Sequence, residues 1–431
     1  MKEKRRNLCK LKVYNKEWLK KSKKCSRIKL GDFMKERVIF HIDVNNAFLS
    51  WTAVYLLENG YKKDIRKIPS IIGGDERARK GIVLAKSPVA KEYGIVTAET
   101  IYSAKKKCPY LEVYPSNYEW YQKKSQELME YLSKYSPIQE QLSVDECFLE
   151  MTGMKYLHND LEKLAYQIKK EIKEKFGYTV NIGIANNKLC AKMASDFEKP
   201  DKVHTLYQKE IAAKMWPLPI EDLYMVGKET AKILRSLRIN TIGDLANTKI
   251  DYLKRYFKNQ AEFLHNQANG IDNSLVEINR EKNQSISTST TLPYDYQDLK
   301  KLEEVLLEQA QEVGRKLRNK KLYANTIGIL LKNNQFTSFQ HQEKLSFSTN
   351  KTQDIYEIAK KLLEESWKND SIRLIGIKLS GLEETRKNQI SIFEEEQEAE
   401  REDKVQKIMD NINNKFGHTT VIPASMTKKQ K

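Results

Sequence analysis

Two short segments that carry acidic residues constrain the fold of this chain more than any other feature. The first, residues 38–44 (VIFHIDV), is an apolar run typical of a buried strand, and it contains Asp43 near its end. The second, residues 143–150 (SVDECFLE), alternates in polarity like a strand and contains the adjacent pair Asp145 and Glu146. Carboxylates that converge from neighbouring strands can hold two divalent cations, as phosphodiester formation requires. We therefore predict a metal site built from these acids.

Each of these features also has an ordinary explanation when it is taken alone. An acid after an apolar strand is often a turn residue or a helix cap, and an adjacent Asp-Glu pair often lies in a solvated loop. Taken together with their flanking sequence, the two segments favour a metal site over these explanations.

Length and composition limit the possible classes. A chain of 431 residues is expected to hold several domains, because single cores rarely grow beyond about 250–300 residues, and a 40% hydrophobic content can supply those cores. Every apolar stretch is interrupted by charge well before the roughly 18 residues of a membrane span. The five cysteines are scattered and form no Cys-x-x-Cys pair, which argues against a disulfide framework or a zinc site and favours the cytoplasm.

The net charge of +18 is unevenly distributed. Residues 1–33 carry 13 Lys/Arg and 3 Asp/Glu, so a basic extension, taken as residues 1–35, holds more than half of the excess. This extension is either an electrostatic arm for DNA, a disordered tail, or an upstream stretch with Met34 as the true start. The smaller excess on the body fits nucleic-acid binding and a well-solvated surface equally well.

The hydrophobic pattern predicts an α+β chain with several domains. We expect a helix over 159–176, a strand over 179–185 and a helix over 187–197, followed by short helices from about residue 207. Residues 284–381 follow the order β-α-β-β-α-β of a compact α+β unit.

Three segments together resemble the Y family of DNA polymerases. They are His41–Phe48, Ser143–Glu150 and Gly183–Pro200, and the likeness extends over about 36–393 in family order. The resemblance implies a right-hand polymerase, whose parts we expect as follows: palm, 36–46 and 117–206; fingers, 47–116; helix-hairpin-helix thumb, 207–277; little finger, 284–382; tail, 383–431. The implied reaction is template-dependent addition of deoxynucleotides to a primer, with low fidelity, in translesion synthesis during DNA repair or damage tolerance.

The same resemblance implies roles for individual residues. Asp43 and Asp145 would bridge two Mg²⁺ ions, with Glu146 on the catalytic ion and the carbonyl of Val44 assisting. Phe48 would be the steric gate that leaves no room for a ribose 2′-hydroxyl. Composition alone would make Phe48 an ordinary core aromatic.

Basic residues are expected to neutralise the triphosphate. Lys199 matches the lysine that reaches the triphosphate in the family, and Lys192, earlier on the same expected helix, is either a second contact or a surface residue. In the fingers this chain departs from the family pattern, because Pro88 replaces a Tyr and Lys91 replaces an Arg. A lysine pairs with phosphate only as a point charge, so triphosphate binding is expected to be weaker or rearranged, with a contribution from Lys86.

The DNA contacts are expected in the helix-hairpin-helix segment Leu223–Thr230. Such hairpins point backbone amides at phosphates, which assigns DNA binding to Gly227 and Lys228. Met225 replaces the first glycine of the motif, which puts its phosphate contacts in doubt.

Beyond the last expected strand, residues 389–393 (QISIF) resemble a peptide that binds the bacterial sliding clamp, with Gln389, Ile390, Ile392 and Phe393 as its contact residues. The alternative for this short motif is an amphipathic tail. Two other functions remain open for the whole chain: a catalytically weak DNA- and clamp-binding factor, and a nucleotide cyclase with a palm-like domain. The cyclase would need neither the hairpin nor the little finger.

Overall fold

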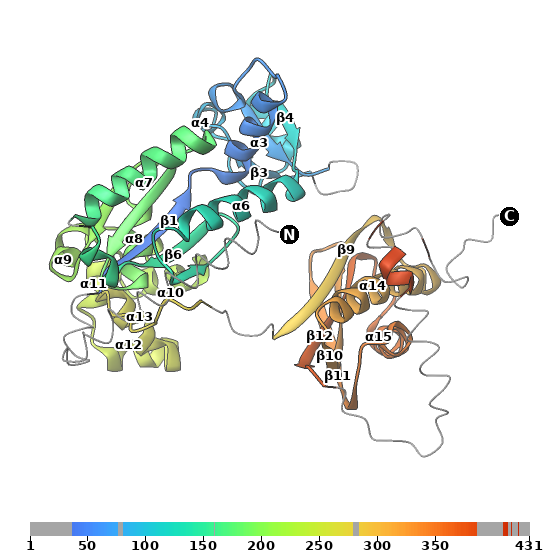
Figure 1. The fold of residues 1–431 in the computed structure, drawn as a ribbon. Helices are drawn as coiled ribbons and strands as arrows, with labels where there is room; N and C mark the ends of the chain where they lie inside the picture. Colours follow the sequence, from blue (N-terminus) through green and yellow to red (C-terminus); the bar gives the residue numbers. More distant parts are fainter. Residues whose placement is uncertain are drawn as a thin grey trace. The chain divides into compact units, whose positions relative to one another are not determined.

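The structure is a computed structural model that describes residues 37–75, 81–158, 160–278 and 284–385, together with 408–412, 415 and 421 (Figure 1). They form two compact units. The second begins after Arg280 and also takes in the short segments Gly74–Ile82 and Thr100–Tyr102. The basic extension and the expected clamp-binding residues Gln389, Ile390, Ile392 and Phe393 lie outside the described residues.

A five-stranded sheet in the order β5-β6-β1-β7-β8 organises the first unit. Its strands are β1 (Ile39–Val44), β5 (Gln139–Gln141), β6 (Glu146–Glu150), β7 (Val180–Ala185) and β8 (Val203–Leu206). The central strand β1 pairs antiparallel with both β6 and β7. The strand expected over 143–150 is shorter than predicted. It begins only at Glu146, because the chain bends through residues 143–145.

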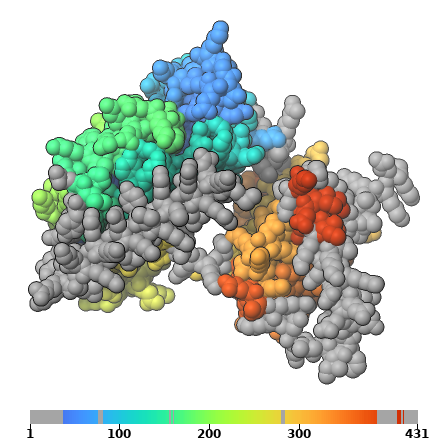
Figure 2. All heavy atoms as spheres, in the orientation of Figure 1, coloured from blue at the N-terminus to red at the C-terminus, as the bar shows by residue number. Residues whose placement is uncertain are grey.

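The alternation of side chains along β1 divides the first unit into two cores. Phe40, Ile42 and Val44 pack with α3 (Ala47–Glu58), α6 (Tyr118–Leu132) and α7 (Leu161–Phe176). Ile39 packs on the other face, in a core shared with α8 (Lys188–Asp196). Asp43 has the parity of Ile39, so its side chain lies on the α8 face. The outer side of α7 is solvent-facing in the space-filling view (Figure 2).

Gly183 of β7 allows α8 to lie very close to the sheet. A Cβ atom at this position would stand 1.9 Å from the carbonyl oxygen of Ala191 and 2.5 Å from the amide nitrogen of Ser195. Both atoms belong to the backbone of α8, so no side-chain rotation could relieve the overlap. The glycine thus sets how near the side chains of α8 come to the acidic end of β1.

The remaining elements of the first unit are short. A three-stranded sheet contains β3 (Val83–Lys86), β2 (Ser70–Gly73) and β4 (Glu112–Pro115), with α4 (Pro88–Glu92) nearby in the chain. The helix α5 (Ile101–Lys107) begins in the short segment Thr100–Tyr102 and continues in the first unit from Ser103. The helices α10 (Lys228–Ser236), α11 (Ile242–Ala246), α12 (Ile250–Phe257) and α13 (Ala261–Ala268) follow α9 (Ile211–Lys214). They contribute Leu234, Leu245 and Leu264 to the core that contains α8.

The second unit has the predicted β-α-β-β-α-β order. Its elements are β9 (Ser285–Tyr296), α14 (Leu299–Asn319), β10 (Tyr323–Asn333), β11 (Ser338–Thr349), α15 (Thr352–Ser366) and β12 (Ile372–Glu383). The strands form an antiparallel sheet in the order β11-β10-β12-β9, and α14 and α15 pack together on one face (Figure 1). None of the helices in the described ranges is long and apolar enough to cross a membrane.

Candidate active site

The backbone brings together the three acids predicted from the sequence. Asp43 on β1 lies directly opposite Glu146 on β6 in the register of the two strands. The amide of the next residue, Val44, donates to the carbonyl oxygen of Asp145 at 3.1 Å. The Asp145 carboxylate accepts a hydrogen bond from Ser143 Oγ at 2.5 Å. Antiparallel pairing thus places residues that are far apart in sequence at one end of the sheet.

Two lysines contact these carboxylates. Lys199 Nζ donates to Asp43 Oδ2, and Lys192 Nζ donates to Glu146 Oε1 at 2.5 Å. Both ammonium groups also reach Asp196, at 2.8 Å from Lys199 and 3.3 Å from Lys192. The expectation that both lysines share a helix is wrong in one detail, because α8 ends at Asp196 and Lys199 lies just beyond it.

Burial and charge shift the pKa values of these groups in opposite ways. Burial raises the pKa of Asp43 to about 6, although Lys199 and Lys192 oppose this shift. Burial alone would lower the pKa of Lys199, but the carboxylates of Asp43 and Asp196 outweigh it and raise the pKa. The pKa of Lys192 is raised against burial as well, through Glu146 and Asp196. Both lysines therefore remain ammonium ions at neutral pH.

The chemistry of the donor set fits divalent cations with oxygen ligands. The ammonium groups of Lys199 and Lys192 mark where positive charge is favourable beside Asp43 and Glu146. Within the described ranges, however, no three acidic, histidine or cysteine side chains are already grouped to hold one ion. The three carboxylates share one end of the sheet, and their side chains would have to reorient to hold one ion together.

Sequence reasoning missed His41, which lies on the same face of β1 as Asp43. Its Nδ1 is 2.8 Å from Ser195 Oγ, and that hydroxyl donates to the carbonyl oxygen of Lys192 at 2.7 Å. Because the hydroxyl proton is used in the second bond, His41 Nδ1 carries the proton of the first. Burial, helped by the two lysines, holds the pKa of His41 well below its usual range. The neutral ring ties β1 to α8, and the parity of residues 41 and 43 was the signal that could have revealed it.

Phe48, the expected steric gate, is held by two tyrosines at the start of α6. Its ring stacks on that of Tyr121 and meets the edge of Tyr118, whose ring centroid is 5.7 Å away. Asn46 begins α3 in the left-handed conformation, with φ of 50°, and so turns the chain sharply between Asp43 and Phe48. Tyr121 is 1% exposed, and nothing in the sequence pointed to it.

The expected nucleotide contacts in the fingers lie on and beside α4. Pro88 occupies the first turn of this helix, where a missing amide proton costs nothing, and Ser87 caps it by accepting from the amide of Ala90 at 2.9 Å. Lys86 precedes the helix, and its carbonyl oxygen accepts from the Asn46 side chain at 2.5 Å. Burial lowers the pKa of Lys86, and the charge of Lys91 lowers it further. The charges of Lys86 and Lys91 are therefore close enough to interact, and the backbone of Lys86 is hydrogen-bonded to Asn46 in the turn after Asp43.

The hairpin before α10 keeps its turn without the first glycine. Met225 has φ of 72°, a left-handed conformation that favours glycine, and its side chain is 63% exposed. Gly227 caps α10 with extended backbone, and Lys228 is the first residue of that helix. A methionine here maintains the backbone shape at a conformational cost, so the replacement does not remove the hairpin.

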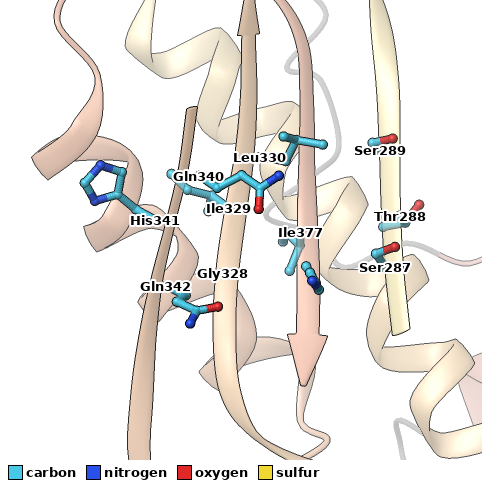
Figure 3. Close-up of a pocket in the computed structure, with 11 residues that line it drawn as sticks. Ser287, Thr288, Ser289, Gly328, Ile329, Leu330, Gln340, His341, Gln342 and Ile377 are labelled. Atoms are coloured by element: carbon cyan, nitrogen blue, oxygen red, sulfur yellow. The ribbon is translucent and has the colours of Figure 1, made fainter. Parts of the chain in front are cut away.

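The sheet of the second unit has a pocket on the face opposite to α14 and α15, and polar side chains line much of it. Across the strands, Gln342, Gly328, Lys378 and Ser287 form one row, and Gln340, Leu330, Gly376 and Ser289 form the next. A Cβ at Gly376 would stand 2.5 Å from the carbonyl oxygen of Thr288. Figure 3 shows this pocket, with Ser287 and Ser289 on β9 on one side and Gln340 and Gln342 on β11 on the other.

Comparison with known proteins identifies similar chains. Residues 42–196 match the impB/mucB/samB family, and residues 283–392 match the C-terminal domain of that family. The chain is 43% identical over 399 residues to DNA polymerase IV of Clostridium acetobutylicum, which covers 91% of this chain and 99% of that protein. It is 33% identical to DNA polymerase IV 2 of Bacillus subtilis, covering 91% of this chain and 95% of that one. A solved structure of a chimeric Y-family DNA polymerase superposes with a TM-score of 0.70 at 24% identity, covering 80% of this chain and 99% of that chain.

Proposed function

Since this chain belongs to the impB/mucB/samB family of Y-family DNA polymerases, we propose that Asp43, Asp145 and Glu146 are its catalytic carboxylates. The chain is a template-dependent DNA polymerase of the translesion type, and its substrates are template DNA and nucleotides. The observation that carries the proposal is the register that sets Asp43 opposite Glu146, with the Val44 amide bonded to the Asp145 carbonyl.

Polymerases of this family depend on metal ions, and we propose two Mg²⁺ ions held by the three carboxylates and the carbonyl of Val44. When bound, such ions activate the primer 3′-hydroxyl and neutralise the charge that develops on the α-phosphate and the leaving pyrophosphate. Lys199 and Lys192 already lie against the carboxylates and would add positive charge for the triphosphate. Lys86 at the end of β3 and Lys91 on α4 would add further positive charge.

Phe48 is proposed to select deoxynucleotides by contact with the sugar. Its ring is packed between Tyr121 and Tyr118, so it resists displacement by a 2′-hydroxyl. A steric gate works only if the blocking ring is held in place, and this packing supplies that condition.

The domain boundaries remain proposals. We assign 36–46 and 117–206 to the palm, 47–116 to the fingers, 207–277 to the thumb, 284–382 to the little finger and 383–431 to the tail. Backbone amides near Gly227 and Lys228 would hold DNA phosphates. The pocket on the sheet of the second unit, which Gly328, Ser287 and Gln342 help to line, would let a DNA strand approach the little finger closely. Because its substrate is DNA, we propose that the enzyme works in the bacterial cytoplasm.

Primer extension tests the catalytic assignment. Wild-type protein and an Asp145→Ala/Glu146→Ala variant are incubated with primed template, Mg²⁺ and each deoxynucleotide, and DNA binding is measured separately by fluorescence anisotropy. Asp201→Asn is the matched control, because Asp201 bonds Lys169 and Lys173 rather than the lysines of the site. We expect extension by the wild type and the control and none by the double variant. Retained DNA binding without extension by the wild type would favour the alternative of a DNA-binding factor.

We also propose that Gln389, Ile390, Ile392 and Phe393 bind a bacterial sliding clamp. The sequence of this segment is the sole support. A Gln389→Ala/Phe393→Ala variant should lose binding to a purified bacterial clamp while its clamp-independent primer extension is unchanged. Ser391→Ala, between the two isoleucines, is the control that should bind normally. Equal clamp binding by all three proteins contradicts the assignment.

A further inference from the structure

Asp196 bonds both lysines that contact the proposed metal ligands. Its Oδ1 is 2.8 Å from Lys199 Nζ, and its Oδ2 is 3.3 Å from Lys192 Nζ. Each ammonium group therefore has two carboxylate partners, one that is proposed to bind metal and one that is Asp196. Lys192 and Asp196 are four residues apart on α8, so they lie on the same side of the helix.

The partners differ in their access to water. The side chain of Asp196 is 42% exposed, whereas that of Asp43 is 8% exposed. An uncompensated carboxylate costs much less when water reaches it than when it is buried. Whenever its carboxyl is ionised, Asp43 thus needs a cation, while Asp196 can gain or lose one at low cost.

A divalent cation at Asp43 and Glu146 has to displace both ammonium groups. Lys199 Nζ and Lys192 Nζ each occupy a carboxylate oxygen that would otherwise be a ligand, and like charges repel at such distances. The displaced ammonium groups need another anion. Asp196 already contacts both, through separate oxygens, so a small rotation of each lysine is enough.

We propose that Asp196 is a positioning residue that takes over the ammonium groups of Lys192 and Lys199 when metal ions bind Asp43 and Glu146. By this exchange it lowers the competition between lysine and metal, and it keeps both lysines near the site for a triphosphate. The inference rests on the proposed function of the three carboxylates and adds a residue that contacts neither metal nor substrate.

Metal affinity without catalysis tests this role. Mn²⁺ binding to wild type and Asp196→Asn is measured by electron paramagnetic resonance, with no DNA or nucleotide present. We expect the variant to bind Mn²⁺ about three- to tenfold more weakly, as suits a partly exposed ion pair, because both lysines then stay on the metal ligands. The control is Asp201→Asn, which also loses a carboxylate with two lysine partners and should bind Mn²⁺ normally.

A double-mutant cycle separates this role from a merely structural one. In a Lys192→Met/Lys199→Met background, Asp196→Asn should no longer change Mn²⁺ affinity, because the competing ammonium groups are gone. Wild-type affinity in Asp196→Asn, or an undiminished effect in the lysine-free background, overturns the role of Asp196 and leaves the catalytic assignment intact. Mn²⁺ binding that Asp145→Ala/Glu146→Ala does not weaken removes the proposed metal site and, with it, this inference. Thermal unfolding of each variant verifies that it is folded.

Discussion

The ring of Phe48 lies almost parallel to the ring of Tyr121, with the centroids 4.7 Å apart and 13° between the planes. Thr52 links the same two residues, because its hydroxyl donates to the carbonyl oxygen of Phe48 and is 2.7 Å from the Tyr121 hydroxyl. Phe48 is thus fixed through both its ring and its backbone. This double contact gives the proposed steric gate a rigid support.

Replacing Phe48 with valine should open the site to ribonucleotides. The smaller side chain leaves space for the 2′-hydroxyl, so the ratio of kcat/KM for a deoxynucleotide to that for its ribonucleotide should fall at least about tenfold. Single-nucleotide primer extension with both substrates measures the ratio. Tyr121→Phe keeps the stacked ring and serves as the control with normal selectivity. An unchanged ratio in Phe48→Val would show that Phe48 is an ordinary core aromatic and not a steric gate.

Gly183→Ala should displace α8 from the sheet. The added Cβ overlaps backbone atoms of Ala191 and Ser195, so the helix must move and the free energy of unfolding should fall by roughly 1–3 kcal/mol. Primer extension should fall by more than the loss of folded protein explains, since Lys192 and Asp196 move with α8. Urea denaturation measures the stability change. Gly227→Ala is the comparison, because a Cβ there meets no atom within 4 Å. Equal stabilities for the two variants would show that α8 shifts at little cost.

Much of this architecture follows from the sequence, because it depends on local pattern. The apolar run at 38–44 predicted β1, and helical spacing predicted α7 and the order of the second unit. The contacts that complete the site do not follow from local pattern. Lys199 meets Asp43 across 156 positions in the chain, and Lys192 meets Glu146 across 46, so only the three-dimensional fold brings them together.

Backbone conformation was the other quantity that the sequence did not reveal. Met225 was identified as a departure from a glycine motif, yet its left-handed φ shows that the turn persists. Similarly, the replacement by Pro88 is compatible with the helix because it falls in the first turn of α4. Whether a substitution disrupts a motif depends on the dihedral angles at that position, and residue type alone does not report them.

Met225→Gly should stabilise the hairpin. Glycine adopts φ of 72° without a Cβ penalty, and after the entropy it adds to the unfolded chain we expect a gain of about 0.5–1 kcal/mol in the free energy of unfolding. Chemical denaturation measures this gain. Met225→Ala retains the penalty and should show none. If alanine stabilises as much as glycine, the exposed methionine side chain rather than the backbone is the source of the cost.

Metal binding should depend on pH through Asp43. Its pKa is raised to about 6, so the protonated form is favoured in the folded protein, and the stability this group contributes is lost as pH rises from about 4 through 6. A metal ion needs the deprotonated form, so Mn²⁺ affinity should rise across the same interval. Titrations at pH 5, 6 and 7 measure the dependence, and Asp43→Asn should flatten it. Affinity that is constant over this range in the wild type contradicts a raised pKa.

The position of β1 at the centre of its sheet has a consequence for motion. Because β1 is hydrogen-bonded along both edges and buried on both faces, its amides should exchange with deuterated water only when the whole unit unfolds. Local opening therefore cannot carry Asp43 away from its neighbours during turnover. The side chains on that strand, rather than its peptide backbone, are therefore the part that we expect to move when Asp43 binds a metal ion.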